Sequence, residues 1–342
     1  MLFSTPLVRA LRQAFPTGHL AYLCNRRTEQ VLAHNPHLNE LFVYEKDEAV
    51  RLWRIAPWQG LRYLGRLLAR IRRSQFDYAL DLSLGERYAF ILKCLGLRRR
   101  IGFDYHRRGR FLTDRLPIDG YHNDHVVAYY RRLLRFVGVV LVDASLELHV
   151  SREDERWAAQ WIKERGLDGS EPVVGVVPAG GVSWGADAPF RRWSLQGFAA
   201  VADTLIERYH ARVILFGEKM DTALCQTVAQ RMNRSVINLS GQTTLGQFVS
   251  LLGRLGLIIC NDGGPLHIAV SQGVKTVSIF GPVDPIVYGP YGPATRHRVV
   301  TKVLPCRPCY HHFKLPPCPY NRACLNEVTV EDVLAAVDEM LT

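Results

Sequence analysis

Short apolar runs alternate with helical patterns along the whole chain, and this alternation restricts the fold more than any other feature. In the first half, His19–Cys24, Leu41–Tyr44 and Tyr78–Leu82 have the length and composition of strands. The helical patterns of this half are Pro6–Phe15, Arg26–His34, Gly60–Arg73, Arg87–Leu95 and His122–Val137. Strands and helices that alternate in this way predict βαβ units and a parallel sheet.

The second half repeats the pattern. Its expected strands are Val173–Val177, Val213–Phe216, Leu257–Cys260 and Thr276–Phe280. Its expected helices are Ser151–Arg165, Ser194–Tyr209, Asp221–Met232, Leu245–Leu255 and Pro265–Gln272. We therefore expect an α/β protein with two doubly wound, Rossmann-like domains, residues 1–148 and 149–325, followed by a C-terminal helix in 326–342. In such sheets, ligands bind beyond the carboxyl ends of the strands.

The start of the chain does not fit this plan. A doubly wound domain normally opens with a strand that becomes central in its sheet. Here the chain opens directly on a helical pattern with Pro6 in its first turn. We expect the first sheet either to be built differently or to lack its opening strand, and a reading frame that begins one strand too late is the simplest explanation.

The charge is concentrated in the first half. Residues 1–150 hold 24 Lys or Arg against 14 Asp or Glu, whereas residues 151–342 hold 19 against 18. A basic half predicts an anionic partner, which is nucleic acid, a phospholipid surface or an acidic glycan. The sequence has no nucleic-acid recognition motif, so nucleic acid is not expected.

The chain is expected to be cytosolic. No stretch reaches the roughly 18–20 apolar residues that a membrane span needs, and the N-terminus lacks the pattern of a signal peptide. In that compartment the eight Cys do not predict disulfides.

The most informative segment is Leu257–Ala269, which reads LIICNDGGPLHIA. Its strand ends in Asn-Asp262, after which Gly263 and Gly264 allow a tight turn into a helix that carries His267. Free N–H groups at that helix start favour a phosphate group. The alternative is a plain strand-to-helix turn.

A second loop follows the strand that ends at Val177. It contains Gly180 and Gly181 and leads to Arg191 and Arg192, just before the expected helix cap Ser194. Small residues and a cation at such a position suit a nucleotide diphosphate. The alternative is a solvated basic pair.

These segments resemble glycosyltransferase family 9, the bacterial heptosyltransferase family of lipopolysaccharide core synthesis. The resemblance is carried by Asp262–Ala269, Phe280–Pro285, Arg191–Ser194 and Gly241–Leu245, and in the first half by Phe76–Leu82 and Arg100–Gly102. Asp262 to His267 is its most specific part. Two departures are Arg191, where the family usually has Lys, and Gly263, where it usually has Ser or Thr.

The resemblance implies a GT-B fold and inverting transfer of heptose, or a related sugar, from ADP-heptose to a lipopolysaccharide inner-core acceptor, without a cofactor for catalysis. It places the acceptor on residues 1–148 and the nucleotide sugar on 149–325. The implied donor-binding residues are Gly180, Gly181, Arg191, Glu218, Asp221, Thr244, Asp262, Gly263, Gly264 and His267. Either Glu218 or Asp221 is expected at the adenosine ribose, and the sequence does not choose between them.

The family's expected general base has no counterpart in this sequence. The family motif Gly-Asp-x-x-x-x-x-Pro aligns with Met1–Pro6 so that its Asp falls one position before Met1. A chain without this base is expected to be poorly active, because general-base catalysis typically contributes about 10²–10⁴-fold. The alternatives are a non-catalytic nucleotide- or glycan-binding relic and, less favoured, another nucleotide-sugar enzyme such as an epimerase.

A basic amphipathic stretch follows Trp53 and Trp58. One helical face holds Leu61, Leu64, Leu67, Leu68 and Ile71, and another holds Arg62, Arg66, Arg70 and Arg73. This pattern is typical of a helix on an anionic bilayer, here the cytosolic face of the inner membrane, or of a helix that covers a sheet. The two interpretations can coexist. A second cluster, Arg98, Arg99, Arg100, Arg107, Arg108 and Arg110, is expected to face the anionic groups of a glycolipid acceptor.

Four Cys near the C-terminus suggest a structural zinc site. They are Cys306, Cys309, Cys318 and Cys324, with His311 and His312 between them. The segment is rich in Pro, and unliganded thiols or redox-dependent disulfides are the alternatives.

Overall fold

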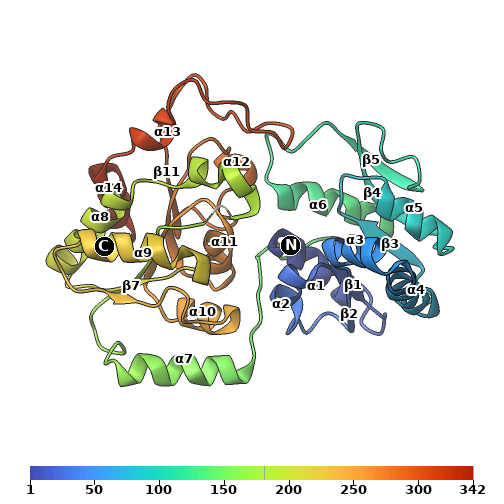
Figure 1. The fold of residues 1–342 in the computed structure, drawn as a ribbon, viewed down its shortest axis with the longest axis horizontal. Coiled ribbons are helices and arrows are strands. Elements are labelled where there is room, and N and C mark those ends of the chain that lie inside the picture. Colours follow the sequence, from blue (N-terminus) through green and yellow to red (C-terminus); the bar gives the residue numbers. More distant parts are fainter. Residues whose placement is uncertain (181, 342) are drawn as a thin grey trace. The chain divides into compact units, whose positions relative to one another are not determined.

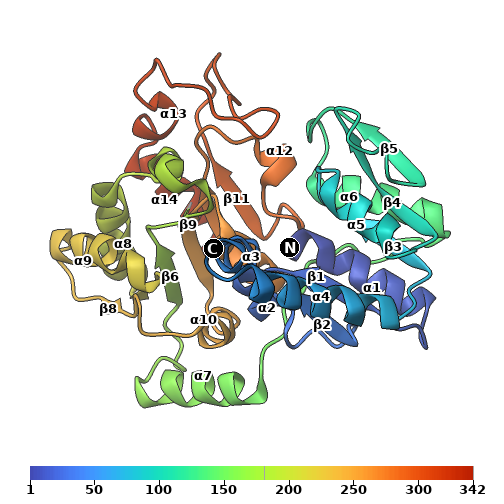
Figure 2. The ribbon, with the colours of Figure 1, turned by 45° about the vertical axis from the view of Figure 1, so that its right-hand side comes forward.

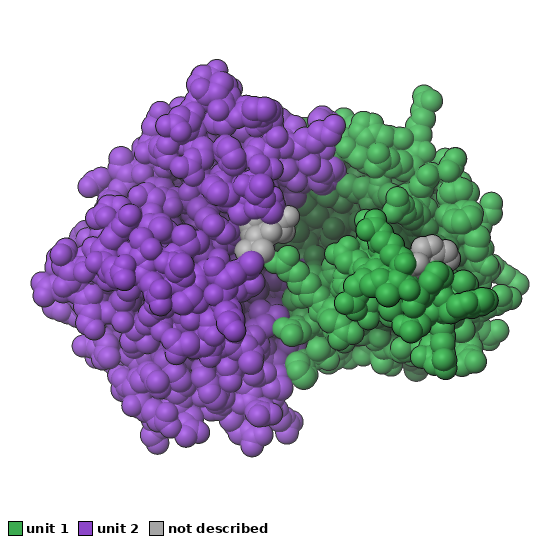
Figure 3. Space-filling view, viewed as in Figure 1, with its two compact units in different colours: residues 1, 3–144 green, residues 2, 145–342 purple. Residues whose placement is uncertain are grey.

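The structure is a computed structural model that describes residues 1–180 and 182–341, apart from the side chains of Ala49, Trp53, Val182 and Ser183. The chain divides into two compact units, coloured separately in Figure 3. Unit 1 consists of residues 1 and 3–144, and unit 2 consists of residues 2 and 145–342.

Unit 1 is built from short strands and helices (Figure 1). In chain order its elements are η1 (Leu2–Ser4), α1 (Thr5–Ala14), β1 (Ala21–Cys24), α2 (Arg26–Leu32), β2 (Glu40–Val43), α3 (Lys46–Ile55), α4 (Pro57–Arg73), β3 (Tyr78–Asp81), α5 (Arg87–Cys94), β4 (Arg99–Tyr105), β5 (Asp114–Ile118), α6 (Val126–Leu134) and η2 (Arg135–Val137). In the described residues no strand precedes α1, as the sequence predicts.

The strands of unit 1 form two separate parallel sheets. One has the order β1-β2 and the other β3-β4-β5. Within the described residues β1 pairs only with β2, and β3 pairs only with β4, so each of these two strands has an unpaired edge. Each sheet has its own small core. Phe42 of β2 packs with Leu67 and Ile71 of α4, and Ile101 and Phe103 of β4 pack with α6.

Unit 2 follows the predicted alternation more regularly. Its elements are α7 (Arg152–Glu164), β6 (Val173–Val177), η3 (Val182–Arg191), α8 (Leu195–Tyr209), β7 (Arg212–Leu215), η4 (Lys219–Asp221), α9 (Thr222–Arg231), β8 (Ile237–Asn238), α10 (Leu245–Leu252), β9 (Leu257–Asn261), α11 (Gly264–Ser271), β10 (Lys275–Ile279), α12 (Pro285–Tyr288), β11 (His297–Val300), α13 (Ala323–Asn326) and α14 (Val330–Leu341).

The six strands of unit 2 form one parallel sheet in the order β11-β10-β9-β6-β7-β8. From β6 the chain builds outward through β7 and β8, then returns to the other side of β6 with β9. The strand order therefore reverses between β6 and β9, which pair from Val174↔Leu257 to Val177↔Cys260. Figure 2 shows these two strands near the middle of the sheet. A reversal of this kind leaves a crevice at the carboxyl ends of the two strands.

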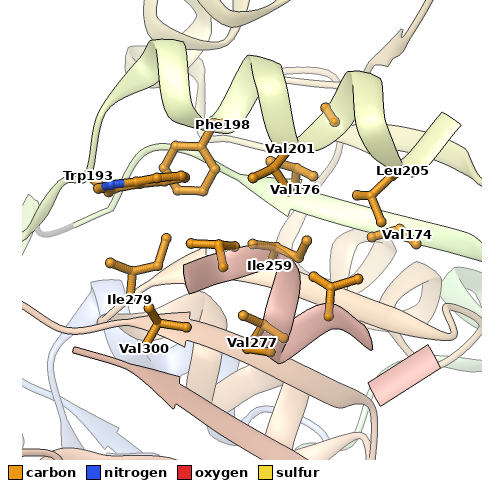
Figure 4. Close-up of a cluster of buried hydrophobic side chains, with 14 of the residues drawn as sticks. Val174, Val176, Trp193, Phe198, Val201, Leu205, Ile259, Val277, Ile279 and Val300 are labelled. Atoms are coloured by element: carbon orange, nitrogen blue, oxygen red, sulfur yellow. The ribbon is translucent and has the colours of Figure 1, made fainter. Parts of the chain in front are cut away.

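A large hydrophobic cluster packs on one face of the unit 2 sheet. Phe198 and Leu205 of α8 pack against Val176, Ile259 and other strand side chains on this face of the sheet (Figure 4). The C-terminal helix α14 belongs to the same core and packs on β10, β11 and α8. Every residue of β6 and of β9 is buried, as expected for the centre of a doubly wound sheet.

No helix in the described part of the chain has the length and apolarity that crossing a membrane requires.

Candidate functional site

Asn261 joins the two loops that emerge where the strand order of unit 2 reverses. It ends β9, and its side-chain amide donates hydrogen bonds to the carbonyls of Pro178 (2.8 Å) and Ala179 (3.1 Å) in the loop after β6. Its Oδ1 accepts a hydrogen bond from the backbone N–H of Trp193 (2.9 Å). Because Asn261 is only 2% exposed, these three bonds satisfy its polar atoms in the interior and fix the shape of the crevice. No expectation drawn from the sequence gave Asn261 a role.

The start of α11 lies directly after Asn261. Gly263 is its N-cap residue and makes no side-chain cap hydrogen bond, so the first N–H groups of α11 have no partner from the cap. A Cβ on Gly264 would meet no atom within 4 Å, which shows that the space above this turn is open. The helix N-terminus therefore offers free donors and positive dipole charge to an anion. His267 lies half-buried in the first turn.

A buried ion pair flanks the start of α11. Arg191 Nη2 lies 2.5 Å from Asp262 Oδ2, and the two side chains are 11% and 1% exposed. Burial raises the pKa of the Asp262 carboxyl, and the Arg191 guanidinium opposes that rise. The structure thus brings together two residues that the sequence assigned to one site from positions 71 apart in the chain.

Aromatic side chains surround Arg191. Its guanidinium carbon lies 4.7 Å from the ring centre of Trp184, and the Trp184 and Tyr310 rings lie 4.7 Å apart at an angle of 30°. Tyr288 of α12 meets Tyr310 edge-on at 6.1 Å. The carbonyl of Pro282, in the predicted Phe280–Pro285 loop, accepts hydrogen bonds from the N–H groups of Cys309 and Tyr310. That loop therefore holds Tyr310 in place.

This aromatic wall was not predicted from the sequence. Trp184, Tyr288 and Tyr310 lie in segments that follow three different strands, β6, β10 and β11, and sequence spacing alone gives no sign that they meet. Their proximity could have been inferred only from the general expectation that the segments after parallel strands lie at the same edge of the sheet.

The remaining predicted donor residues follow β6, β7 and β8. Arg192 Nε donates to the Gly180 carbonyl (2.9 Å), and its Nη2 lies 3.9 Å from Asp221 Oδ1. Gly180 has φ +113°, a conformation that favours glycine. Gly181 lies outside the described residues.

Glu218, Asp221 and Thr244 are all used in capping helices. Glu218 and Asp221 form a capping box at η4, and Thr244 caps α10 by accepting a hydrogen bond from the N–H of Gln247 (3.1 Å). Asp221 is 5% exposed, whereas Glu218 is exposed. Of the two residues considered for the ribose, Glu218 is therefore the accessible one.

The predicted zinc site is not formed. Cys306, Cys309, Cys318 and Cys324 are free thiols, and within the described residues no three His, Cys, Asp or Glu side chains are arranged to hold a metal ion. Burial raises the pKa of Cys324, which is 8% exposed and packs in the hydrophobic core of unit 2. Cys324 also interacts electrostatically with Cys306, Cys309 and Cys318, so the four thiols lie near one another, and the described residues lack the arrangement that a metal requires.

Half of the second basic cluster in unit 1 is engaged within the protein. Arg99 pairs with Asp114 (3.0 Å), Arg110 pairs with Glu86 (2.8 Å), and Arg100 Nε donates to the Phe111 carbonyl (2.7 Å). The other members, Arg98, Arg107 and Arg108, form no ion pair in the part of the chain that the structure describes. Their charges are therefore available to an external anion.

Asp81 ends β3 at the carboxyl edge of its sheet. It is 8% exposed, and its Oδ1 accepts a hydrogen bond from the N–H of Ser83 (2.9 Å). Burial raises the pKa of this carboxyl.

A family model and two curated relatives, both named as heptosyltransferases, match most of the chain. The family model described as "Glycosyltransferase family 9 (heptosyltransferase)" matches residues 64–316. Lipopolysaccharide heptosyltransferase 3 of Escherichia coli K12 is 23% identical over 351 residues, covering 100% of this chain and 94% of the relative. Lipopolysaccharide core heptosyltransferase OpsX of Haemophilus influenzae is 22% identical, covering 83% of this chain and 76% of the relative.

Solved structures show the same fold. A family 9 glycosyl transferase from Veillonella parvula superimposes with a TM-score of 0.79 at 25% identity, covering 99% of this chain and 93% of that one. ADP-heptose lps heptosyltransferase II of E. coli gives 0.74 at 22% identity, covering 100% and 95%. The GT-B fold class, with its Rossmann-like units of parallel sheet, is thereby confirmed.

Proposed function

The chain belongs to glycosyltransferase family 9, and we propose that it transfers heptose from ADP-heptose, with inversion, to the inner core of a lipopolysaccharide acceptor. Membership of the family confirms a glycosyltransferase. The donor, the stereochemistry and the acceptor are the proposal, and the relatives named as lipopolysaccharide heptosyltransferases support it.

The observation that carries the proposal is the uncapped start of α11 beside Arg191, at the point where the strand order reverses. Free N–H groups, a helix dipole and a guanidinium together suit the two phosphates of a nucleotide sugar. The open space above Gly264 leaves room for the diphosphate to approach the backbone. We therefore assign the donor to unit 2, with Gly180, Asp262, Gly263 and His267 around it.

The two partners of the buried ion pair are proposed to have different roles. Arg191 is proposed to donate to the leaving diphosphate through Nε, which is buried without a hydrogen-bond partner, while its Nη2 stays paired with Asp262. Asp262 is proposed to hold Arg191 in place before the donor binds. Glu218 is proposed to contact the ribose, because Asp221 is buried and committed to Glu218 and Arg192.

In an inverting transfer the acceptor hydroxyl attacks the anomeric carbon from the face opposite the diphosphate. A bond from that oxygen to carbon forms as the bond from carbon to the phosphate oxygen breaks, and the electron pair leaves with ADP. The acceptor proton passes to a general base. Unit 1 is proposed to bind the acceptor, with Arg98, Arg107 and Arg108 contacting its anionic groups.

Asp81 can be tested directly as the proton acceptor. A carboxylate whose pKa is raised is a better base, and Asp81 lies where a parallel sheet presents functional side chains. Asp81→Asn keeps the oxygen that accepts from Ser83 and removes the basicity. If Asp81 is the base, this variant loses about 10²-fold or more in kcat while KM for the donor is unchanged. A merely structural Asp81 leaves kcat unchanged.

The proposed location is the cytosolic face of the inner membrane, where a lipopolysaccharide precursor presents its core sugars. The proposed partners are the ADP-sugar, an anionic glycolipid and the membrane surface. No nucleic acid is involved in this proposal.

The test is a transfer assay with ADP-heptose and a core acceptor that lacks heptose. Product is followed by mass spectrometry, and the anomeric configuration of donor and product is compared by NMR. UDP- and GDP-sugars serve as matched donors. We expect transfer from ADP-heptose alone, with inverted configuration, and a higher donor KM for Glu218→Ala. Transfer from UDP-sugars only, or retained configuration, would contradict the proposal.

A further inference from the structure

The corner between α3 and α4 exposes large apolar side chains. The two helices are joined by Ala56 alone, and around this joint Ile55 is 76% exposed, Trp58 84% and Leu61 53%. We call residues 50–62 the α3–α4 corner. Single exposed apolar residues are common on proteins. Three large ones within seven positions form an apolar patch of the kind that marks an interaction surface.

The corner is distinct from the part of α4 that packs on a sheet. Leu67 and Ile71 are buried against Phe42, and they account for the covering role that the sequence allowed. The apolar face that the sequence predicts for α4 therefore has a buried part and an exposed part. Its later residues belong to the core of unit 1, whereas Leu61 at its start joins Ile55 and Trp58 in solvent.

The corner carries a net positive charge, although Asp47 lines one shallow pocket with Arg51, Arg54 and Ile55. Residues 49–76 contain seven Arg and no Asp or Glu. Arg70 pairs with Glu40 (2.6 Å) and is thereby neutralised. Arg51, Arg54, Arg62 and Arg66 are exposed and form no ion pair among the described residues. The nearest acidic side chains in sequence, Asp47 and Glu48, lie in the first turn of α3, where the helix dipole stabilises them.

We infer that the α3–α4 corner inserts its apolar side chains into an anionic phospholipid bilayer while its arginines contact the headgroups. An exposed Trp beside Ile and Leu, ringed by unpaired arginines, has the composition of an interfacial anchor. The net positive charge of the surroundings, four exposed arginines against Asp47 and Glu48, favours anionic lipid over an apolar protein surface. The inference rests on the proposed function, which places the acceptor lipid in such a membrane, and it identifies the surface that meets it.

The test measures sedimentation of the full chain with phosphatidylcholine vesicles that contain or lack phosphatidylglycerol. Arg51→Gln with Arg54→Gln and Arg62→Gln should reduce binding to anionic vesicles about 100-fold, at about 1 kcal/mol for each arginine. Ile55→Ser with Trp58→Ser should reduce it about tenfold, because two apolar side chains no longer enter the bilayer.

Matched controls separate the corner from overall charge and apolarity. Arg152→Gln with Arg156→Gln and Arg231→Gln removes the same charge from unit 2, and Val142→Ser removes another exposed apolar side chain, 86% exposed. Both controls should bind vesicles like the parent. Equal losses in the controls and the corner variants, or equal binding of the parent to vesicles with and without phosphatidylglycerol, would overturn the inference.

A transfer assay with a water-soluble acceptor separates this inference from the proposed function. The corner variants should turn over that acceptor at the parental rate, because the corner contacts lipid and not the reacting groups. Loss of vesicle binding with full soluble activity supports the inference. Full vesicle binding by the corner variants contradicts it, whether or not heptose is transferred. Each variant changes exposed side chains only, and thermal melting should confirm unchanged folding.

Discussion

The two units are both built from parallel strands and helices, but their strands are paired and buried to different extents. In unit 2, six parallel strands form one sheet whose central strands, β6 and β9, are buried along their whole length. In unit 1, five strands form two sheets, and the strands with unpaired edges are only partly buried. Leu23 of β1 is 38% exposed and Tyr78 of β3 is 42% exposed. Among the described residues, the hydrophobic cluster on one face of the unit 2 sheet is also larger than the clusters around Phe42 and Ile101 in unit 1.

This difference suits the two proposed roles. A continuous sheet with one reversal of strand order holds the Arg191–Asp262 pair and the start of α11 in fixed geometry, as a diphosphate site requires. Unit 1 carries the exposed corner and the unpaired arginines, which suit a large, anionic partner. Unpaired strand edges and small cores also predict that unit 1 has the lower local stability.

The greatest loss of stability is expected from the core of unit 2. Phe198→Ala removes a fully buried ring that meets Trp193 at 5.1 Å, and it should lower the free energy of unfolding of unit 2 by about 3–5 kcal/mol. Urea denaturation should show unit 1 unfolding first, with Trp fluorescence reporting mainly the later transition of unit 2. Phe90→Ala in unit 1, 48% exposed, is the control and should leave that later transition in place. One cooperative transition that both variants shift equally would abolish the distinction.

Acid should also affect unit 2 through His297. Burial lowers the pKa of His297 to about 4, so the folded state keeps it neutral while the unfolded chain takes up a proton below about 6.5. The unfolding free energy of unit 2 should therefore fall by about 3 kcal/mol as the pH drops from 6.5 to 4, and this contribution is present in full above 6.5.

Two variants isolate this contribution. His297→Gln removes the titration and should flatten the pH dependence of the unit 2 transition, although it changes the contact with Thr276 Oγ1 at 3.0 Å. His210→Asn, at an exposed αL position after α8, should keep the parental slope. An unchanged slope in His297→Gln would mean that another group titrates.

Asn261→Ala should have an intermediate effect. The variant leaves two carbonyls and one N–H without partners and should cost about 2–3 kcal/mol of unit 2 stability. It should also weaken ADP binding, because the loops after β6 and β9 lose their connection. Asn326→Ala, which removes an exposed bond to the Asn321 carbonyl, is the control. Calorimetry that finds parental ADP affinity in Asn261→Ala would show that the two loops hold their shape without it.

The mildest change is expected in unit 1. Leu23→Ala in β1 should cost about 1 kcal/mol, since the side chain is already partly in solvent, whereas Leu257→Ala in fully buried β9 should cost about 2–5 kcal/mol. The two variants make the same chemical change in the two sheets, and chemical denaturation measures both. Equal costs would show that β1 is as well packed as β9 and would remove the contrast between the two sheets.

The sequence predicted the strands that are apolar throughout and missed elements that begin with or contain many charged residues. Periodicity located β6, β7, β9, β10 and the helices between them, because buried parallel strands are apolar throughout. It missed β4, whose first two residues are Arg99 and Arg100 with their side chains used in local hydrogen bonds and an ion pair. It also missed α3. That α1 follows the first residues with no strand before it among the described residues was expected from the helical pattern after Met1.

Residues of the candidate site could be predicted only where they belong to a short, recognisable sequence segment. The turn at Asp262–Gly264 was found from its Gly residues, and Arg191 from its place before a helix cap. The link through Asn261 and the contact between Trp184 and Tyr310 depend on loops distant in sequence, and no local pattern reveals them. The cysteines show the limit of spacing, because the four thiols interact electrostatically while no three ligands among the described residues are arranged to hold a metal ion.

The proposed function depends on unit 2 holding the nucleotide diphosphate through Arg191 at the start of α11. The decisive experiment is titration calorimetry with ADP, using the parent, Arg191→Ala and Arg212→Ala. Arg212 lies at the opposite end of the same sheet, 3.7 Å from Glu171, and is the matched control. We expect Arg191→Ala to weaken ADP binding by about 10–100-fold, the worth of a charged hydrogen bond, and Arg212→Ala to bind like the parent. Equal affinity in all three proteins would contradict the assignment of Arg191 to the diphosphate.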